Sequence, residues 1–287
     1  MKNVFLPLIA LVLCFGCTSN VSDNKIKEEL VEYALLTPTD FRQRISEAPI
    51  AYLPLGTLEW HGEHLPLGSD GLQSFEFMKL LAREAGGIVL PMLFLGPDSV
   101  RVIDGETYYG MDHFLNQEGR REYYPEQQLD GSCYWVPDEL FKSMLENTIS
   151  QLARAGFKII VAHGHGPSTQ TVLKYWDEWE QKYEVMIFTA WAWNVRGESD
   201  EQASNRAREG IGIMTDHAAT NETSLMMYFY PELIRMDLLP EDTASWPVGV
   251  WGVDPRLHAS SELGKEAVDY HLHRMKGVLQ GALESLD

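Results

Sequence analysis

Residues 59–70, EWHGEHLPLGSD, combine carboxylates and imidazoles in a pattern suited to binding a divalent cation. Glu59 and His61 are two residues apart, so their side chains point to the same side of an extended segment. Asp70 follows the turn LPLGS and can return toward the same place, just ahead of a helix. Because carboxylates and imidazoles together suit zinc, manganese or iron, this spacing predicts a metal site.

Two further clusters of the same kind lie far along the chain. His165 belongs to AHGHG, and both His217 and Glu222 belong to TDHAATNETS. Taken alone, each can be a solvated loop residue, and Asp70 or Asp216 can simply cap a helix. The occurrence of three such clusters, all at junctions between elements, favours one shared metal site over three unrelated polar loops.

The elements around these clusters alternate between strands and helices. Apolar runs predict strands at 48–56, 87–96, 158–166 and 184–193. Helical spacing of apolar residues predicts helices at 71–85, 138–155 and 168–183. This order predicts an α/β fold of three layers, with a mostly parallel central sheet flanked by helices. Ligands of such sheets bind at the carboxyl ends of the strands, where EWHGEH and AHGHG lie.

Aromatic residues and one long excursion are the candidates for a substrate pocket. Residues 97–135 are rich in Gly, Tyr and Asp without periodicity, so we expect a long functional excursion. Trp176 and Trp179 are three apart on a predicted helix and should pack in the core. Trp191 and Trp193 share one face of a strand end and are candidates for a pocket wall.

The N-terminal sequence MKNVFLPLIALVLCFGC resembles a bacterial lipoprotein signal. Its apolar run is too short to span a bilayer as a stable helix. We expect residues 1–17 to be a signal peptide with Cys17 lipidated, residues 18–35 a tether and leading helix, and residues 36–287 a single domain. The protein would then be an exported, membrane-anchored lipoprotein, periplasmic or at the cell surface. An ordinary signal peptide or an uncleaved anchor is the alternative.

The net charge limits the classes of binding partner, and the cysteine content limits the possible disulfides. The formal net charge of −19 repels nucleic acid and anionic lipid, so we expect no nucleic-acid partner and membrane contact only through the lipid anchor. Cys14 would leave with the signal and Cys17 would carry lipid, which leaves Cys133 without a disulfide partner. Stability must therefore come from a hydrophobic core.

The stretch LPLGTLEWHGEHLPLGSD resembles the signature of the creatininase (creatinine amidohydrolase) family, PxGSxEQHGxHLPxxTD. Three later stretches resemble family segments in the same order: ARAGFKIIVAHGHGPS, DHAATNETSLMMYFYPEL and WGVDPRLHASSELGKEA. The resemblance covers roughly residues 45–275. It implies an α/β fold with a parallel sheet, a centre of one or two metal ions, hydrolysis of C–N bonds in amides, and a homo-oligomer that is commonly a hexamer.

Carried over residue by residue, the resemblance implies four metal ligands: Glu59, His61, Asp70 and His165. It places Asp70 between two ions, makes Glu222 a metal ligand or a base, and gives His217 a role in proton transfer or substrate binding. The chain departs from the family at Pro167, where creatininase itself has a glutamate ligand. Glu222 or His163 are the candidates to replace that ligand, and we expect a substrate other than creatinine.

These inferences predict a metal-dependent hydrolase of a small cyclic or linear amide, with one or two divalent ions. Zinc or manganese is expected, with iron as a third candidate, and metal-activated water would be the nucleophile. Glu222 would pass the proton and His217 would protonate the leaving nitrogen, with Asp216 able to orient His217. The alternatives are a surface-tethered, non-catalytic metal- or ligand-binding protein on the same fold, and a hydrolase of lactones or other esters.

Overall fold

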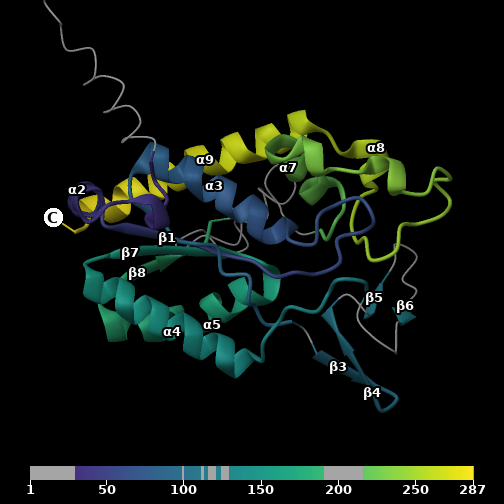
Figure 1. Ribbon diagram of the computed structural model, residues 1–287, viewed down its shortest axis with the longest axis horizontal. Coiled ribbons are helices and arrows are strands. Elements are labelled where there is room, and N and C mark those ends of the chain that lie inside the picture. Colours follow the sequence, from purple (N-terminus) through teal and green to yellow (C-terminus); the bar gives the residue numbers. More distant parts are fainter. Residues whose placement is uncertain are drawn as a thin grey trace, which may run out of the picture. The chain divides into compact units, whose positions relative to one another are not determined.

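Four strands form a parallel sheet in the order β2-β1-β7-β8 (Figure 1). Their bounds are β1 (Ile50–Leu55), β2 (Ile88–Val89), β7 (Ile159–Gly164) and β8 (Met186–Phe188). This computed structural model describes residues 30–98, 100–110, 113–115, 121–123, 129–190 and 216–286. Residues Val31–Asp287 form one unit. The expected lipidation site Cys17 and the pocket candidates Trp191 and Trp193 lie outside the described residues.

The register of the two central strands explains their composition. In the pairing of β1 with β7, Ile50 lies beside Ile159, and Leu55 lies beside Gly164. All of β1 and nearly all of β7 is buried, as expected for strands that helices cover on both faces. Both strands therefore end at the same edge of the sheet, and the predicted α/β fold with a parallel central sheet is confirmed.

Helices cover the two faces of the sheet (Figure 1). One face carries α3 (Ser69–Ala85), α7 (Thr220–Phe229) and α9 (Ser261–Glu284). The other carries α4 (Asp138–Ala155) and α5 (Gly166–Tyr183). The shorter helical elements are η1 (Tyr33–Leu35), α2 (Pro38–Glu47), η3 (Pro231–Leu233), η4 (Met236–Leu238) and α8 (Pro255–His258). Among the described residues, every helix is too short or too polar to cross a lipid bilayer.

The core is divided by the sheet because neighbouring strand residues point to opposite faces. Ile50 and Tyr52 pack with α3 and α9, whereas Ala51 and Leu53 pack with α4 and α5. Trp179 is fully buried in the second of these clusters, and Trp176 packs against it, as predicted.

The second strand is shorter than its apolar run predicts. Pro91 has no N–H to donate, so the regular ladder stops at β2. The chain nevertheless continues beside β1, where Leu93 donates to the carbonyl of Pro54 and accepts from Gly56.

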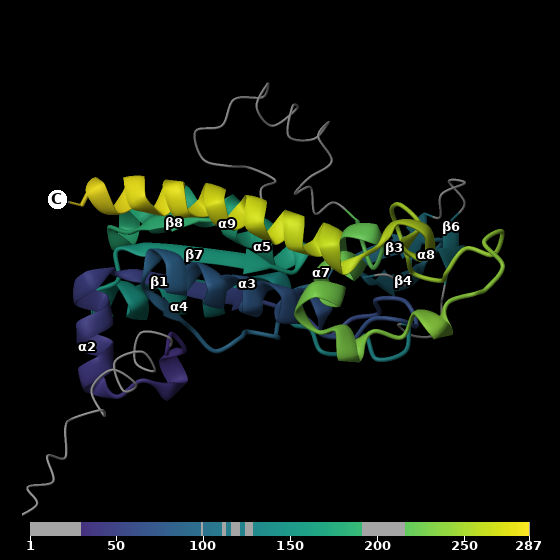
Figure 2. The same ribbon diagram turned by 90° about the horizontal axis from the view of Figure 1, so that it is seen from above.

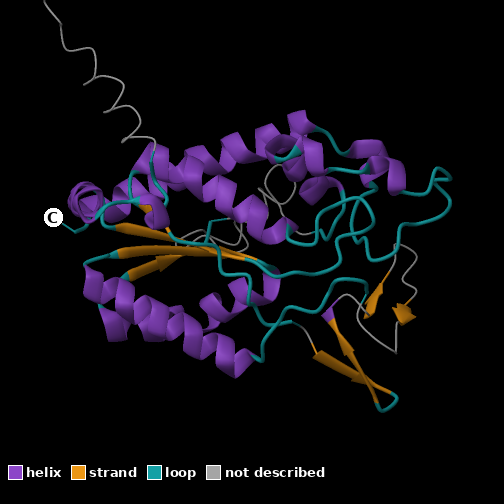
Figure 3. Ribbon diagram, in the orientation of Figure 1, coloured by secondary structure: helices purple, strands orange, loops and turns teal. Residues whose placement is uncertain are grey.

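The long excursion contains two small antiparallel sheets (Figure 3). In the first, β3 (Val100–Ile103) pairs with β4 (Glu106–Tyr109), and in the second, β5 (His113–Leu115) pairs with β6 (Arg121–Tyr123). Asp104 and Gly105 join β3 to β4, both with positive φ. An Asp-Gly pair between two short strands is a strong hairpin signal, and it explains why this part of the excursion is regular.

A close helix crossing places α7 against the rest of the molecule. Figure 2 shows α9 running along the sheet to α7. At the crossing, a Cβ on Gly264 would lie 2.0 Å from the carbonyl oxygen of Ser224. The backbones can approach this closely only because residue 264 has no side chain.

Substitution of this glycine should therefore destabilise the fold. We expect Gly264→Ala to lower the free energy of unfolding by about 2 kcal/mol or more, because backbone atoms must move apart. Gly277→Ala, in the same helix with open space around it, should instead raise that energy by about 0.5–1 kcal/mol. Chemical denaturation measures the free energy of unfolding of both variants. Equal changes in that energy would contradict the close crossing at Gly264.

Candidate metal centre

The candidate residues come from the segments that follow β1 and β7 and from the start of α7. Glu59 and His61 lie between β1 and α3, and Asp70 lies in the first turn of α3. His165 directly follows β7 and is the N-cap of α5. His217 precedes α7, and Glu222 lies in its first turn. Glu59, His61, His165 and Glu222 are buried, with exposed fractions of 0–8%.

His61 lies at the middle of this group. Its Nε2 is 3.6 Å from Asp70 Oδ1, 3.6 Å from Glu222 Oε2 and 4.0 Å from Glu59 Oε1. These separations are long for hydrogen bonds. They suit ligand atoms of a common ion, because two ligands each about 2.1 Å from a tetrahedral zinc are about 3.4 Å apart.

Two more imidazoles, which come from other segments of the chain, lie close to Glu59 Oε1. It is 3.7 Å from His165 Nε2 and 3.8 Å from His217 Nδ1. The rings of His61 and His217 also lie close, with centroids 4.4 Å apart. The three clusters of carboxylates and imidazoles that the sequence predicts to share a site therefore lie together in the fold.

Each of the three histidines has its outer nitrogen occupied. His61 Nδ1 lies 3.1 Å from the carbonyl oxygen of Glu59, and His217 Nε2 lies 2.7 Å from that of Trp60. Because a carbonyl oxygen only accepts, each neutral ring carries its hydrogen there and turns its other lone pair inward. His165 Nδ1 similarly lies 3.1 Å from Ser168 Oγ. Outer partners of this kind are typical of metal-binding histidines.

The inward-facing atoms form three overlapping groups whose members lie within 4.8 Å of one another. The groups are Glu59–Asp70–His165, His61–Asp70–Glu222 and Glu59–His61–His217. Asp70 belongs to the first two, so one carboxylate lies between two candidate ion positions. Within the described residues no lysine or arginine pairs with these carboxylates, and His61 Nε2 is buried without a hydrogen-bond partner. Such a set of acceptors fits divalent cations.

Electrostatics within the group support this interpretation. Burial, and then the neighbouring charge of Asp70, raises the pKa of Glu59 well above its ordinary value, and burial raises that of Glu222. Burial alone would lower the pKa of His61, but Asp70, Glu222 and Glu59 outweigh it and raise that pKa to about 10. Burial also opposes ionisation of Asp70, yet His61 lowers its pKa below the ordinary value. Without cations, the centre therefore holds protons.

The two remaining imidazoles stay neutral and available. Burial lowers the pKa of His165 to about 4. Burial, and then the charge of His61, lowers the pKa of His217 to about 3. A neutral imidazole is the form that binds a metal ion or accepts a proton.

The two candidates to replace the glutamate absent at Pro167 lie in different surroundings. Glu222 belongs to the second group, whereas His163 belongs to none of the groups found among the described residues. Burial, followed by the charges of His271 and Arg274 in α9, lowers the pKa of His163 to about 3.

Of the two roles considered for Asp216, the structure shows the helix cap. Its carboxylate accepts from the backbone N–H groups of Asn221, at 2.7 Å, and of Glu222, at 3.3 Å. It therefore caps the start of α7, and His217 is oriented by the carbonyl of Trp60 instead.

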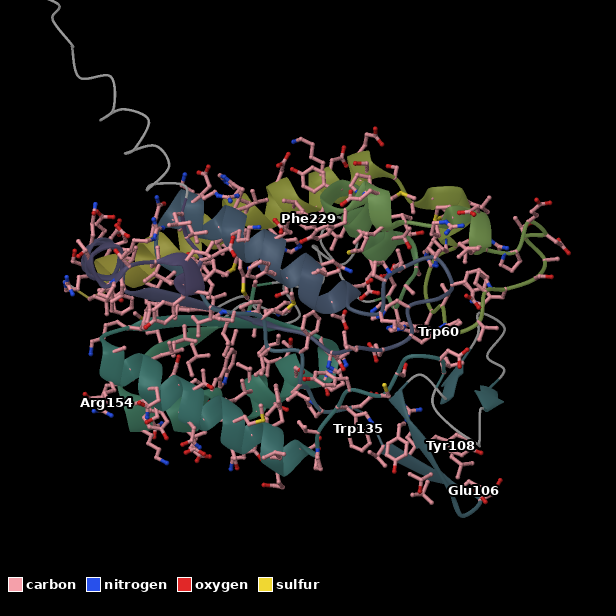
Figure 4. All side chains as sticks on the ribbon, viewed as in Figure 1. Trp60, Glu106, Tyr108, Trp135, Arg154 and Phe229 are labelled. Atoms are coloured by element: carbon pink, nitrogen blue, oxygen red, sulfur yellow. The ribbon has the colours of Figure 1, made fainter. Side chains whose placement is uncertain are left out.

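Both ends of the excursion 97–135 return to this centre. Ser132 Oγ accepts from the N–H of Trp60 at 2.6 Å, and a bridge joins Leu58 to Tyr134. At the other end, a Cβ on Gly96 would lie 2.4 Å from Ser168 Oγ. Figure 4 labels Trp60 and Trp135 at the end of the sheet where these segments meet. The sequence contains no local signal for these long-range contacts.

Comparisons with known proteins agree with this architecture. A family model described as creatininase, creatinine amidohydrolase, matches residues 34–116 and 125–276. Creatinine amidohydrolase of Pseudomonas putida is 24% identical over 232 residues, which are 77% of this chain and 80% of that protein.

Two solved structures share the fold. A creatininase variant described as the zinc–zinc type is 19% identical, with a TM-score of 0.62, and the match covers 87% of this chain and 97% of that one. A manganese creatininase is 21% identical, with a TM-score of 0.57, and the match covers 88% of this chain and 98% of that one. Structural likeness at these identities shows the fold alone.

Ion binding should displace protons from this centre. The pKa of His61 is about 10, so its Nε2 is protonated at neutral pH and a cation must compete for it. Calorimetric titration of the metal-free protein with zinc, in buffers of different ionisation enthalpy, should show release of at least about one proton near pH 7. The apparent affinity should rise as the pH approaches 10. Binding without proton release would contradict this electrostatic account.

Proposed function

The chain belongs to the creatininase family of metal-dependent amidohydrolases, and on that premise we propose that it hydrolyses a C–N bond in a small cyclic or linear amide. The observation that carries this proposal is the convergence of three imidazole nitrogens on the carboxylates of Glu59, Asp70 and Glu222. Such a set is stable only with positive charge among its members.

Two ions would share this centre, with Asp70 contributing to both. The first would be held by Glu59 and His165, and the second by His61 and Glu222. The donors are oxygen and imidazole nitrogen without thiolate, which suits zinc or manganese, with iron as a third candidate. When bound, such ions lower the pKa of water from about 16 toward about 7 and polarise a carbonyl.

Glu222 is better suited to holding an ion than to carrying a proton. Its Oε2 accepts from the N–H of Ala218 at 2.6 Å, which fixes its direction, and lies 3.6 Å from His61 Nε2. This carboxylate therefore replaces the glutamate that is absent at Pro167. Because the replacement comes from a different segment, we expect a substrate other than creatinine.

His217 then remains as the group that transfers protons. Its Nε2 hydrogen is committed to the carbonyl of Trp60, so its Nδ1 lone pair faces the centre. We assign to Nδ1 the acceptance of a proton from the attacking water and its delivery to the leaving nitrogen. The same atom also belongs to the group Glu59–His61–His217, so it lies within reach of the ions.

The excursion 97–135 is the proposed source of substrate selectivity. One end contacts the loop that carries Glu59 and His61, where Ser132 accepts from the N–H of Trp60. At the other end, Gly96 lies beside His165, in the segment that follows β7. Sequence changes within the excursion can therefore alter the surroundings of the centre while the ligand set stays in place.

Two carboxylates in one segment allow a matched test of the ion-binding role. Asp70→Asn should remove both ions and lower turnover at least about 100-fold, because it weakens both groups. Glu63→Gln removes the same charge from an exposed residue that belongs to none of the three groups, so ion content and turnover should be unchanged. Elemental analysis and hydrolysis assays measure both quantities.

The substrates for this assay should include lactams, cyclic ureides, formamides and lactones. Cleavage of an amide by the ion-loaded protein supports the proposal, and cleavage of lactones alone would reassign the reaction to esters. Ion binding without hydrolysis of any of them would favour a non-catalytic binding protein. Full turnover by Asp70→Asn would contradict the ion-dependent mechanism.

A further inference from the structure

The second histidine of HGEH has no role in the proposed mechanism. His64 is 1% exposed, and it belongs to none of the ligand groups that the described residues form. Its Nε2 lies 2.9 Å from Thr223 Oγ1 in α7, which is 159 residues away in the sequence. Thr223 directly follows the candidate ligand Glu222.

We propose that His64 is a positioning residue that holds the α7 turn, residues 216–219, and thereby directs His217 and Glu222 into the centre. This inference rests on the proposed function of that centre. It assigns the two histidines of HGEH to different tasks, with His61 facing the ions and His64 holding the segment that completes their site.

The direction of the hydrogen bonds follows from the chemistry of the hydroxyl. Thr223 Oγ1 has one hydrogen, which it donates to the carbonyl oxygen of Ala218 at 3.3 Å. It must therefore accept from His64, so the hydrogen of that ring lies on Nε2. The bonds run from the imidazole to the hydroxyl and from the hydroxyl to the turn, all within buried surroundings.

The turn needs such support because its backbone is strained. Ala218 has a φ of 52°, in the left-handed region that residues with a side chain rarely adopt. Its carbonyl accepts from Thr223, and its N–H donates to Glu222 Oε2 at 2.6 Å. On the other side, His217 exchanges two backbone hydrogen bonds of 2.8 Å with Trp251. Ala218 therefore connects the two functional residues, because it directly follows His217 in the chain and its N–H holds the side chain of Glu222.

His64 is itself held in place. Its carbonyl oxygen accepts from the N–H of Arg235 at 2.9 Å. Gly62 has a φ of 68°, and a Cβ there would lie 2.7 Å from His64 Nδ1. The chain can therefore reverse at Gly62, so that His61 enters the centre while His64 reaches α7.

Two pairs of variants test the inference. His64→Leu removes the donor, whereas His64→Gln places an N–H near the position of Nε2. Thr223→Val removes the hydroxyl at nearly constant shape, whereas Thr223→Ser retains it. Ser224→Ala is the control for a general loss of stability, because Ser224 is the next residue of α7 and bonds Thr220 and Ser260 instead of the turn.

The measurement is zinc and cobalt binding to each folded variant, by calorimetry and by the visible absorption of cobalt. His64→Leu and Thr223→Val should weaken the ion held by His61 and Glu222 by about 10–100-fold and change its cobalt spectrum. The ion held by Glu59 and His165 should change by less than about 3-fold. His64→Gln, Thr223→Ser and Ser224→Ala should bind both ions nearly as the parent protein does.

The outcomes separate this inference from the proposed function. If the parent protein binds no ion, the proposed function fails and the inference fails with it. If the parent binds two ions and both donor-removing variants keep both affinities, or lose both equally, the positioning role alone is wrong. Should His64→Leu not fold, Thr223→Val decides, since valine preserves the packing volume.

Discussion

The organisation of this protein depends on placing three carboxylates, two of them buried, and three imidazole nitrogens around one small volume. Like charges at these distances repel strongly in a poorly solvated site, so the arrangement requires protons or cations. Without an ion, His61 takes a proton and the pKa values of Glu59 and Glu222 rise. Divalent ions would supply the positive charge that these carboxylates require, with two charges per ion where a proton brings one. The proposed chemistry and the electrostatics of the folded chain therefore have one origin.

The fold satisfies this requirement by bringing chain segments to a common edge. Because β1 and β7 pair in parallel and end side by side, the residues after each strand are neighbours although about 100 positions separate them. At Gly164 a Cβ would overlap the carbonyl oxygen of Leu55, so only glycine permits that pairing. The third segment, which carries His217 and Glu222, lies at the start of α7. The close crossing at Gly264 packs α7 against α9. Glycines at both contacts allow the backbones to approach.

Backbone groups then determine the direction of the side chains. The carbonyls of Glu59 and Trp60 orient the rings of His61 and His217, and the N–H of Ala218 orients Glu222. In the proposed centre, a carboxylate from α7 would consequently take the place of the glutamate that is absent at Pro167, in the segment after β7.

Short-range patterns in the sequence were sufficient to predict the parallel sheet and the convergence of Glu59, His61, Asp70 and His165, because periodicity, glycines and motif spacing are local. The Asp-Gly pair at 104–105 is a local signal of the same kind, for the hairpin of β3 and β4. Only the tertiary structure shows the nearness of Glu222 to His61 and Asp70, the capping role of Asp216 and the contact of His64 with Thr223. Each depends on where a side chain points after distant segments have packed, and spacing along the chain does not encode that direction.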